Sequence, residues 1–401
     1  MRLSSRKRQL ISDRPASSSC VSDALGLGEN GMKETSFGIA AAEKSDAAYK
    51  LAPIFVSAYA TVYALKLSVV SLWRTIRATE WWGYKLAPML GSAYATAYIL
   101  KLSLISLWPL FLMALAALVP CAAYVSVIND LTDLKDDLAS GKANRLVGRS
   151  RVFVVALLAC CILPGVSLAI YWRREPGLLS LYLGAWAAFT LYSLPPVRLK
   201  SRGVFGLLAD ACGAHLFPTL FAVYLVYRWR GEPLDRVWFA LVAVWSLCCG
   251  VRGILWHQLT DLDNDEKIRL RTFARQHNLS SLGRLSNFVV FPVELCTFAL
   301  ILWRIESRIA FAFLIVYALL EFARARLWRI EFVVAVPKPN FQIVMLEYYE
   351  LFFPLAVVLS SSMRFPVDAI IAAVHIALFR RRATQTLRDC VQLIRDGWMY
   401  G

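Results

Sequence analysis

The sequence lacks the features that mark several common classes of protein. It has no visible polar folded domain on which its net charge of +16 could form a nucleic-acid-binding surface, so we expect no nucleic-acid partner. Its nine cysteines show no metal-binding or redox spacing. The pairs Cys160–Cys161 and Cys248–Cys249 lie inside apolar runs, where cysteine is usually a small hydrophobe. The N-terminal segment has no apolar stretch typical of a secretory signal peptide.

Apolar residues, in contrast, are in surplus. The chain has 401 residues, of which 58% are hydrophobic, whereas soluble domains are about 45–50% apolar. A soluble core cannot use this surplus but a lipid bilayer can. We therefore predict an all-α, multi-pass transmembrane helical bundle, that is, an integral membrane protein in contact with lipid. Residues 1–46 are polar, and we expect them to be disordered.

An internal repeat follows this polar segment. Residues 49–73 begin YKLAPIFVSAYAT and residues 84–108 begin YKLAPMLGSAYAT, at an offset of 35 residues. Two copies are too few for a solenoid, so we interpret them as the duplication of one hydrophobic helix. Residues 47–83 would then be either an extra span or a helix on the membrane surface. The second copy opens the predicted transmembrane domain, residues 84–365.

A helix needs about 20 predominantly apolar residues to cross the hydrocarbon core. The last candidate is short, and with the tail it forms a region, residues 366–401, that we expect to be an additional helix and a basic cytoplasmic tail. The candidate spans are 85–105, 108–128, 152–172, 177–194, 204–227, 237–257, 286–303, 308–324, 344–361 and 366–380.

The loops between these spans alternate in charge. The longer loops are rich in Lys and Arg, and the positive-inside rule places them in the cytoplasm. If the last candidate crosses, the cluster Arg380–Arg382 joins the same side. All the polar motifs described next fall on this side, so we expect the active site at the cytoplasmic face; the organelle is not predicted. The basic loops are 129–151, 195–203, 259–285 and 325–343.

Two groups of acids follow apolar helices. In NDLTDLKDD, the residues Asn129, Asp133 and Asp137 are spaced i, i+4, i+8, which puts three oxygen ligands on one helix face. Asp130 lies on a neighbouring face close to Asp133. In DLDND, Asp261 and Asp265 share a face at i, i+4.

Acids near a membrane are costly and usually require a cation. An EF-hand is excluded at DLDND, because Glu266 stands where the calcium loop needs glycine. Magnesium, which takes oxygen ligands and commonly holds substrate phosphates, fits two opposing acidic faces around a diphosphate. Each cluster alone could instead be ordinary solvated loop acids.

Basic residues accompany the acids. Arg198, Lys200 and Arg202 follow the pair Pro195–Pro196, which favours a defined turn. Lys142 and Arg145 follow the first acidic helix, and Arg271 and Arg275 follow the second. Such side chains can neutralise the diphosphate oxygens that magnesium leaves free. The positive-inside rule alone also predicts basic loops, and it is the commoner explanation for any single arginine.

These three motifs, in this order, resemble the UbiA prenyltransferase superfamily over about residues 80–360. NDLTDLKDD with the following Asn144-Arg145 is similar to the family's first aspartate motif, DLDND to its second, and YSLPPVRLKSRG to the loop after its fourth helix. The resemblance implies about nine core helices around a central cavity that opens laterally to lipid, with extra helices here at both ends. One departure is that Arg77 is not followed by the proline many members have.

The resemblance also implies an activity: Mg²⁺-assisted ionisation of an isoprenyl diphosphate and transfer of the prenyl group to an aromatic or other lipophilic acceptor. Lys200, Arg145, Arg198 and Arg202 would bind the diphosphate. Aromatic faces could stabilise the allylic cation, although a core role is commoner for each candidate: Tyr124, Tyr192, Trp186 and Trp256. Asp210 and His257 are minor candidates for acceptor contacts. The metal ligands would be Asn129, Asp130, Asp133, Asp137, Asp261 and Asp265.

Other functions remain open from the sequence. A terpene cyclase of the same superfamily would quench the cation within its own chain, and some relatives transfer a phosphoribosyl group. A cation-coupled transporter is the candidate from a different class, because intramembrane acids also mark ion pathways. The acids here cluster at one membrane face, whereas transporter sites usually lie near the midplane. Acceptor, donor chain length and oligomeric state are not predicted, and no protein partner is inferred.

Overall fold

The structure, a computed structural model, describes residues 70–400. The predicted disordered segment 1–46 and nearly all of the first repeat copy, residues 49–73, lie outside the described residues. Both predictions therefore stay predictions.

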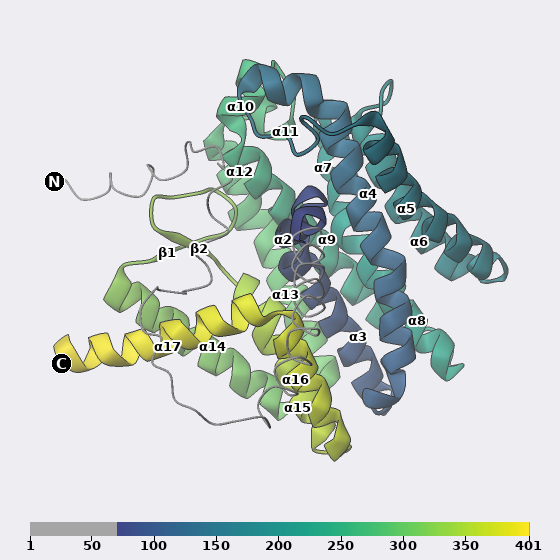
Figure 1. Cartoon of the computed structure of the whole chain (residues 1–401). Helices are drawn as coiled ribbons and strands as arrows, with labels where there is room; N and C mark the ends of the chain where they lie inside the picture. The colour runs from purple at the N-terminus through teal and green to yellow at the C-terminus, as the bar shows by residue number, and fades with distance from the viewer. Residues whose placement is uncertain (1–69, 401) are drawn as a thin grey trace, which may run out of the picture. The chain divides into compact units, whose positions relative to one another are not determined.

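All the predicted spans are helical (Figure 1). The chain ends in a further long helix, and two short strands, β1 (Glu331–Val333) and β2 (Phe341–Ile343), pair in parallel after α14. The main helices are α3 (Ala87–Ile99), α4 (Trp108–Ser140), α5 (Arg151–Tyr171), α6 (Pro176–Ser193), α7 (Val204–Ala211), α8 (Phe217–Arg230), α9 (Arg236–Thr260), α12 (Leu279–Leu285), α13 (Phe291–Ile305), α14 (Arg308–Trp328), α15 (Phe353–Ser362), α16 (Ala369–Leu378) and α17 (Arg380–Tyr400).

Four helices are entered through a five-residue π-helical turn, and in each case a proline is the second residue of the helix that follows. The prolines are Pro88, Pro218, Pro292 and Pro354. Proline has no N–H and its ring clashes with the carbonyl four residues back, so a turn widened by one residue relieves the clash without ending the helix. The turns are η1 (Trp82–Leu86), η5 (Cys212–Leu216), η6 (Ser286–Val290) and η7 (Tyr348–Phe352).

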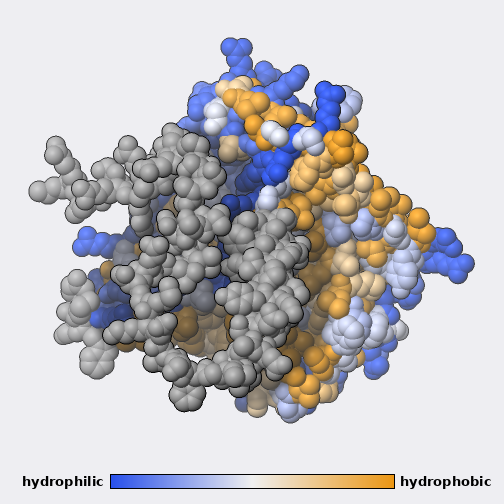
Figure 2. Space-filling model, in the orientation of Figure 1, coloured by the Kyte–Doolittle hydropathy of each residue, from blue (hydrophilic) through white to orange (hydrophobic). Residues whose placement is uncertain are grey.

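The outer surface is that of a membrane protein. Five helical stretches among the described residues are long and apolar enough to cross a bilayer, which makes the protein a multi-pass integral membrane protein. Figure 2 shows hydrophobic side chains along the flank formed by α5 and α6, and hydrophilic ones at the end where α10 (Leu262–Lys267) lies. On α5, Val152 is 78% exposed and Leu163 is 66% exposed, as expected for side chains that face lipid.

Helix α3, which comes from the second repeat copy, has the opposite environment. Every residue from Ala87 to Ala97 is buried, and the helix packs against α8 and α15. Its small residues allow close packing, because a methyl group on Gly91 would lie 3.0 Å from the ring of Pro354. Thr96 accepts a hydrogen bond from the indole of Trp238 at 3.0 Å. The helix is thus enclosed by the bundle.

Two acid-bearing segments meet at one end of the bundle. The last turns of α4 contact α10, which directly follows α9 (Figure 1). An ion pair of 2.7 Å between Lys142 and Asp261 joins the two segments. Of residues 366–401, predicted as an additional helix and a basic tail, the described part forms α16 and α17, so the tail is helical as far as residue 400.

Candidate active site

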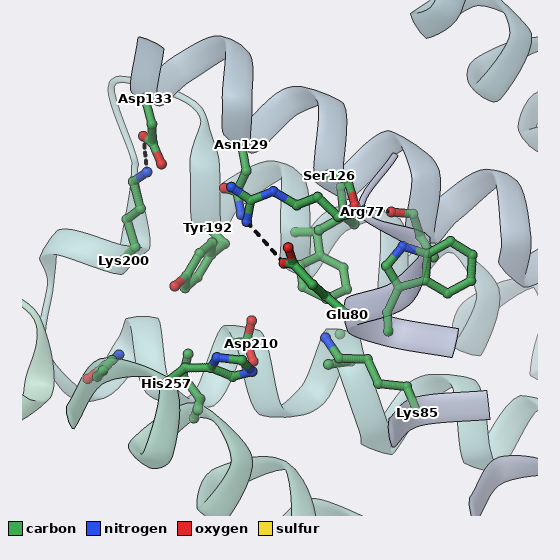
Figure 3. A pocket seen from close by; sticks show the side chains of 18 of the residues that line it. Arg77, Glu80, Lys85, Ser126, Asn129, Asp133, Tyr192, Lys200, Asp210 and His257 are labelled. Carbon is green, nitrogen blue, oxygen red and sulfur yellow. Dashed lines mark hydrogen bonds and ion pairs between the residues drawn. The ribbon is translucent and has the colours of Figure 1, made fainter. Parts of the chain in front are cut away.

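The two acid segments face one cavity, of about 260 Å³. It lies between the end of α4, the end of α9 with α10, the loop after α6, and the segment before α3 (Figure 3). Five of the six predicted metal ligands line it: Asn129, Asp133, Asp137, Asp261 and Asp265.

Helix α4 presents its three polar residues because it continues without a break through Asp137. The side-chain oxygen of Asn129 accepts a hydrogen bond from Ser193 at 2.6 Å. The carboxylate of Asp137 accepts one from Asn144 at 2.8 Å, and the amide of Asn144 also donates to the backbone of Asp130. The turn after the helix is therefore folded back onto its last acidic turn.

The second acid segment is built differently. Helix α9 ends at Thr260 and α10 starts at Leu262, so Asp261 lies at the junction and Asp265 one turn later. Asp265 is only 8% exposed, and its carboxylate accepts a hydrogen bond from Thr272 at 3.2 Å. Burial, together with the nearby Asp261 carboxylate, raises the pKa of Asp265 to about 6. A bound cation would relieve this accumulation of negative charge.

Lys200 closes the cavity from the loop after α6. It is 4% exposed and forms an ion pair with Asp133. Burial lowers the pKa of Lys200, and the Asp133 carboxylate opposes that shift. The loop lies directly on α7, because a methyl group on Gly206 would be 2.8 Å from the Cα of Lys200. A backbone bridge between Gly203 and Thr272 joins this loop to the segment after α10.

Four of the predicted site residues do not line the cavity. Asp130, expected among the metal ligands, is buried beside Arg77, with 2.7 Å between its carboxylate and the guanidinium. Arg202, expected on the diphosphate, donates to the carbonyls of Val197 and Pro196 at 2.6 and 3.1 Å. Asp130 therefore holds the Arg77 guanidinium, and Arg202 stabilises its own loop.

Arg145 and Arg198 do not line the cavity either, but each pairs with an acid that does. Arg145 pairs with Glu80, and Arg198 bonds Asp133 at 3.0 Å and Asp136 at 2.6 Å. Sequence position correctly put both arginines near the acids. It could not tell which acid each one would meet, because that depends on how the loops fold over α4.

The cations that do reach the cavity, besides Lys200, are Arg77, Lys85 and Lys142. Sequence reasoning noted Arg77 only as a departure from a family pattern and missed Lys85 and Glu80. A signal for Lys85 was available: it stands at the start of an apolar span, where a charge is costly and usually functional. In Figure 3, Arg77 contacts Glu80, and Lys85 projects from the segment before α3.

The aromatic candidates divide in a similar way. Tyr192 lines the cavity and Figure 3 shows its ring between Lys200 and Glu80. Phe189 and Trp81, not predicted, also line it. Trp256 is not part of the wall, and Tyr124 and Trp186 pack on each other with ring centroids 4.9 Å apart. The two minor candidates, Asp210 and His257, lie on the wall as well.

The donor set suits magnesium in its chemistry, because it consists of carboxylate and amide oxygens facing one cavity. Among residues 70–400, however, no three histidine, cysteine, aspartate or glutamate side chains lie close enough to hold an ion as they stand. The reason is visible in the contacts: Asp133 and Asp261 are each turned toward a lysine, Lys200 and Lys142 respectively. These side chains would have to exchange partners when an ion binds.

The model of the UbiA prenyltransferase family matches residues 86–332. No curated protein matches the chain significantly. A solved structure described as a UbiA homolog from Archaeoglobus fulgidus bound to GPP and Mg2+ is similar at 15% identity, with 75% of this chain and 99% of that chain covered and a TM-score of 0.46. Because the family match spans more than half of the chain and includes both acid segments and the Lys200 loop, the protein belongs to the UbiA prenyltransferase family.

Proposed function

We propose that the protein is a magnesium-dependent intramembrane prenyltransferase, which ionises an isoprenyl diphosphate and transfers the prenyl group to an aromatic or other lipophilic acceptor. The observation that carries the proposal is that a single cavity, at one end of an apolar bundle, is lined by five oxygen-ligand residues and by Lys200. Family membership supports the same reaction class.

In this proposal Asn129, Asp133, Asp137, Asp261 and Asp265 hold Mg²⁺, which when bound would neutralise the diphosphate and make it a better leaving group. Lys200, Lys142 and Arg77 donate hydrogen bonds to the remaining diphosphate oxygens. Each of these cations lies next to a carboxylate, so it is already held at the cavity before substrate arrives. In many enzymes, such preorganised charges make the largest single contribution to the rate acceleration.

The chemical step breaks the allylic C–O bond, and the electron pair leaves with the diphosphate. A nucleophilic atom of the acceptor then bonds to the allylic carbon and loses a proton. The faces of Tyr192 and Phe189 border the cavity and can stabilise the cation by about 0.5–2 kcal/mol each. His257 and Asp210 line the wall and are placed to accept a hydrogen bond or a proton from the acceptor.

The apolar part of the wall would receive the isoprenoid tail. Leu86, Met89 and Leu118 line it, and all three are buried side chains of the bundle core. An apolar wall also excludes water, which would otherwise capture the cation. The active-site end would be the cytoplasmic one, in keeping with the basic loops at that end.

The test is a set of single alanine variants at Asp133, Asp137, Asp261 and Asp265, purified in nanodiscs and supplied with Mg²⁺ and radiolabelled prenyl diphosphates. Diphosphate release is the readout, because it needs no knowledge of the acceptor. Asp263→Ala is the matched control, since Asp263 is an exposed acid of the same segment that does not line the cavity. We expect all four variants to lose release and the control to keep it.

Undiminished release in all four variants would end the assignment. Prenyl products formed without any acceptor would favour a cyclase, in which the cation is quenched within its own chain. Ion-dependent flux in liposomes without diphosphate release would favour a cation-coupled transporter.

A further inference from the structure

A second cavity, of about 560 Å³, lies beside the segment that precedes α3. Different residues of that segment line the two cavities. Glu80, Trp81 and Lys85 face the candidate active site, whereas Trp82 and Tyr84 face the second cavity. The other wall of the second cavity is the junction between α16 and α17. None of the catalytic steps proposed above uses this cavity.

The wall of the second cavity is basic. Three arginines, Arg380, Arg381 and Arg382, line it against one acid, Glu350. Arg382 donates to the buried Glu350 carboxylate at 2.6 Å, so these two charges compensate each other. Arg380 and Arg381 are exposed, and among the described residues no carboxylate pairs with either of them. Two positive charges therefore remain available to an anion.

The backbone adds to this positive field. Arg380 and Arg381 are the first residues of α17, a helix of 21 residues. The N-terminus of such a helix carries partial positive charge and unpaired N–H groups, which favour phosphate-type anions. The arginine side chains and the N-terminus of α17 thus both contribute positive charge to the second cavity.

Aromatic side chains line the wall of the second cavity opposite the arginines. The rings of Trp73 and Trp82 lie 5.1 Å apart. The indole of Trp82 donates to the carbonyl of Leu378 at 2.9 Å, which ties the segment before α3 to the last turn of α16. Tryptophan and tyrosine are enriched at the level of lipid headgroups, because one end of the ring system is apolar and the other polar.

An apolar path leads away from the cavity along α16. Ala377 and Leu378 line the cavity, and Val374 and Ile370 lie one and two turns before Leu378 on the same helix face. Ile370 is 54% exposed and Val374 is 44% exposed. A soluble phosphate ion has no apolar part that could contact these side chains, whereas the acyl chains of a lipid would cover them.

We propose that the second cavity binds the phosphate headgroup of an anionic membrane lipid. Arg380 and Arg381 neutralise the phosphate, Trp73 and Trp82 border the headgroup, and the acyl chains lie along Ile370 and Val374. The bound lipid also braces the segment that carries Glu80 and Lys85 to the candidate active site, so this lipid supports donor binding there; only that consequence rests on the proposed function.

The primary test is direct lipid binding, measured by native mass spectrometry of the purified full-length protein titrated with phosphatidylglycerol or with phosphatidylcholine. The double variant Arg380→Gln/Arg381→Gln should bind phosphatidylglycerol about tenfold to thirtyfold more weakly, from roughly 1 kcal/mol for each basic residue near a membrane surface. The matched control is Arg388→Gln/Arg395→Gln, which removes the same charge from exposed positions of α17 outside the cavity. We expect the control to bind as the wild type does.

Equal phosphatidylglycerol binding by the wild type and the Arg380/Arg381 variant would overturn the proposal, and so would an equal loss in the control. A third arm adds millimolar inorganic phosphate to the protein titrated with phosphatidylglycerol. Saturation of the cavity by phosphate alone, seen as full competition against phosphatidylglycerol, would assign the site to a soluble anion and overturn the lipid assignment. Circular dichroism of each variant separates loss of binding from loss of fold.

Diphosphate release is the secondary readout. The Arg380/Arg381 variant should raise KM for the prenyl diphosphate severalfold in anionic nanodiscs and leave it unchanged in phosphatidylcholine nanodiscs. Because lipid binding is measured independently of turnover, failure of the lipid site and failure of the proposed enzymatic function give different results.

Discussion

The two acid-bearing segments of the cavity differ in how their charges are compensated. On α4, Asp133 is paired with Lys200 and Arg198, and Asp137 accepts a hydrogen bond from Asn144. Across the cavity, the cation that pairs with Asp261 among residues 70–400 is Lys142, which is supplied from the α4 side. Asp265 has a hydroxyl partner, Thr272, and a like-charged neighbour.

From this difference we infer which of the two acid segments should bind a cation first. Asp133 on α4 is paired with two cations, whereas among the described residues no cation forms an ion pair with Asp265, whose pKa burial and the Asp261 carboxylate raise to about 6. A first Mg²⁺ should therefore bind at the Asp261–Asp265 side. The α4 acids would join only when the diphosphate draws Lys200 away from Asp133.

The largest expected loss of activity comes from substituting Asp265, in the acid segment with less charge compensation. Asp265→Asn should lower kcat/KM by about 10²–10³-fold, the range for losing one electrostatic contact to the reacting groups. It should also weaken Mg²⁺ binding in the absence of substrate, measured by isothermal titration calorimetry. Asp133→Asn should weaken substrate-free Mg²⁺ binding much less. Equal weakening by the two variants would contradict the proposed order of binding.

The second prediction concerns Lys200, which pairs with Asp133 on α4. Lys200→Met should raise KM for the prenyl diphosphate and lower kcat/KM by about 10²-fold, because one contact to the diphosphate is lost. At the same time it removes one of the two cations paired with Asp133 and leaves only Arg198, so Mg²⁺ binding without substrate should become tighter than in the wild type. Steady-state kinetics and calorimetry measure the two opposite effects, and a variant that weakens both would contradict the assigned role.

Gly206 tests whether the position of Lys200, and not only its charge, matters. A methyl group there would lie 2.5 Å from the carbonyl oxygen of Leu199, so Gly206→Ala must displace the loop. A misplacement of about 1 Å can cost up to about 10²-fold in rate, and we expect a loss of about tenfold in kcat/KM. Gly397→Ala is the control, because nothing lies within 4 Å of the added methyl. Unchanged kinetics for Gly206→Ala would show that the loop tolerates the shift.

The smallest expected effect is at Arg202. Within the described part of the chain its side chain donates to two carbonyls of its own loop, and it does not line the cavity. Arg202→Gln should change kcat/KM by about twofold or less, in line with surface substitutions away from special features. A loss comparable to that of Lys200→Met would restore Arg202 as a diphosphate contact.

Much of the architecture was predictable because its causes are local. Apolar runs of sufficient length predicted the spans, and all of them are helical. The i, i+4, i+8 spacing correctly put Asn129, Asp133 and Asp137 on one face. The four π-helical turns also have a local cause, the prolines after them, although the spacing alone predicted only ordinary helices.

The pairing of charges was not predictable in the same way. Arg77 meets Asp130 across 53 residues of sequence, and Arg145 meets Glu80, an acid of the segment before α3. Long side chains in loops can reach several partners, and periodicity does not choose between them. For this reason the sequence could not show that Asp130, Arg145, Arg198 and Arg202 lie off the cavity wall; their roles as a metal ligand and as diphosphate contacts stay predictions.

Sequence alone determined that the chain is a membrane bundle with two acidic helix ends on one side, because hydropathy and helical spacing depend only on neighbouring residues. The tertiary structure decided which cations face the cavity, which acids are already neutralised, and that a second basic cavity lies behind the segment before α3. Those outcomes depend on which segments, distant in sequence, come to lie opposite each other, since charges act over a few ångströms through space and not along the chain.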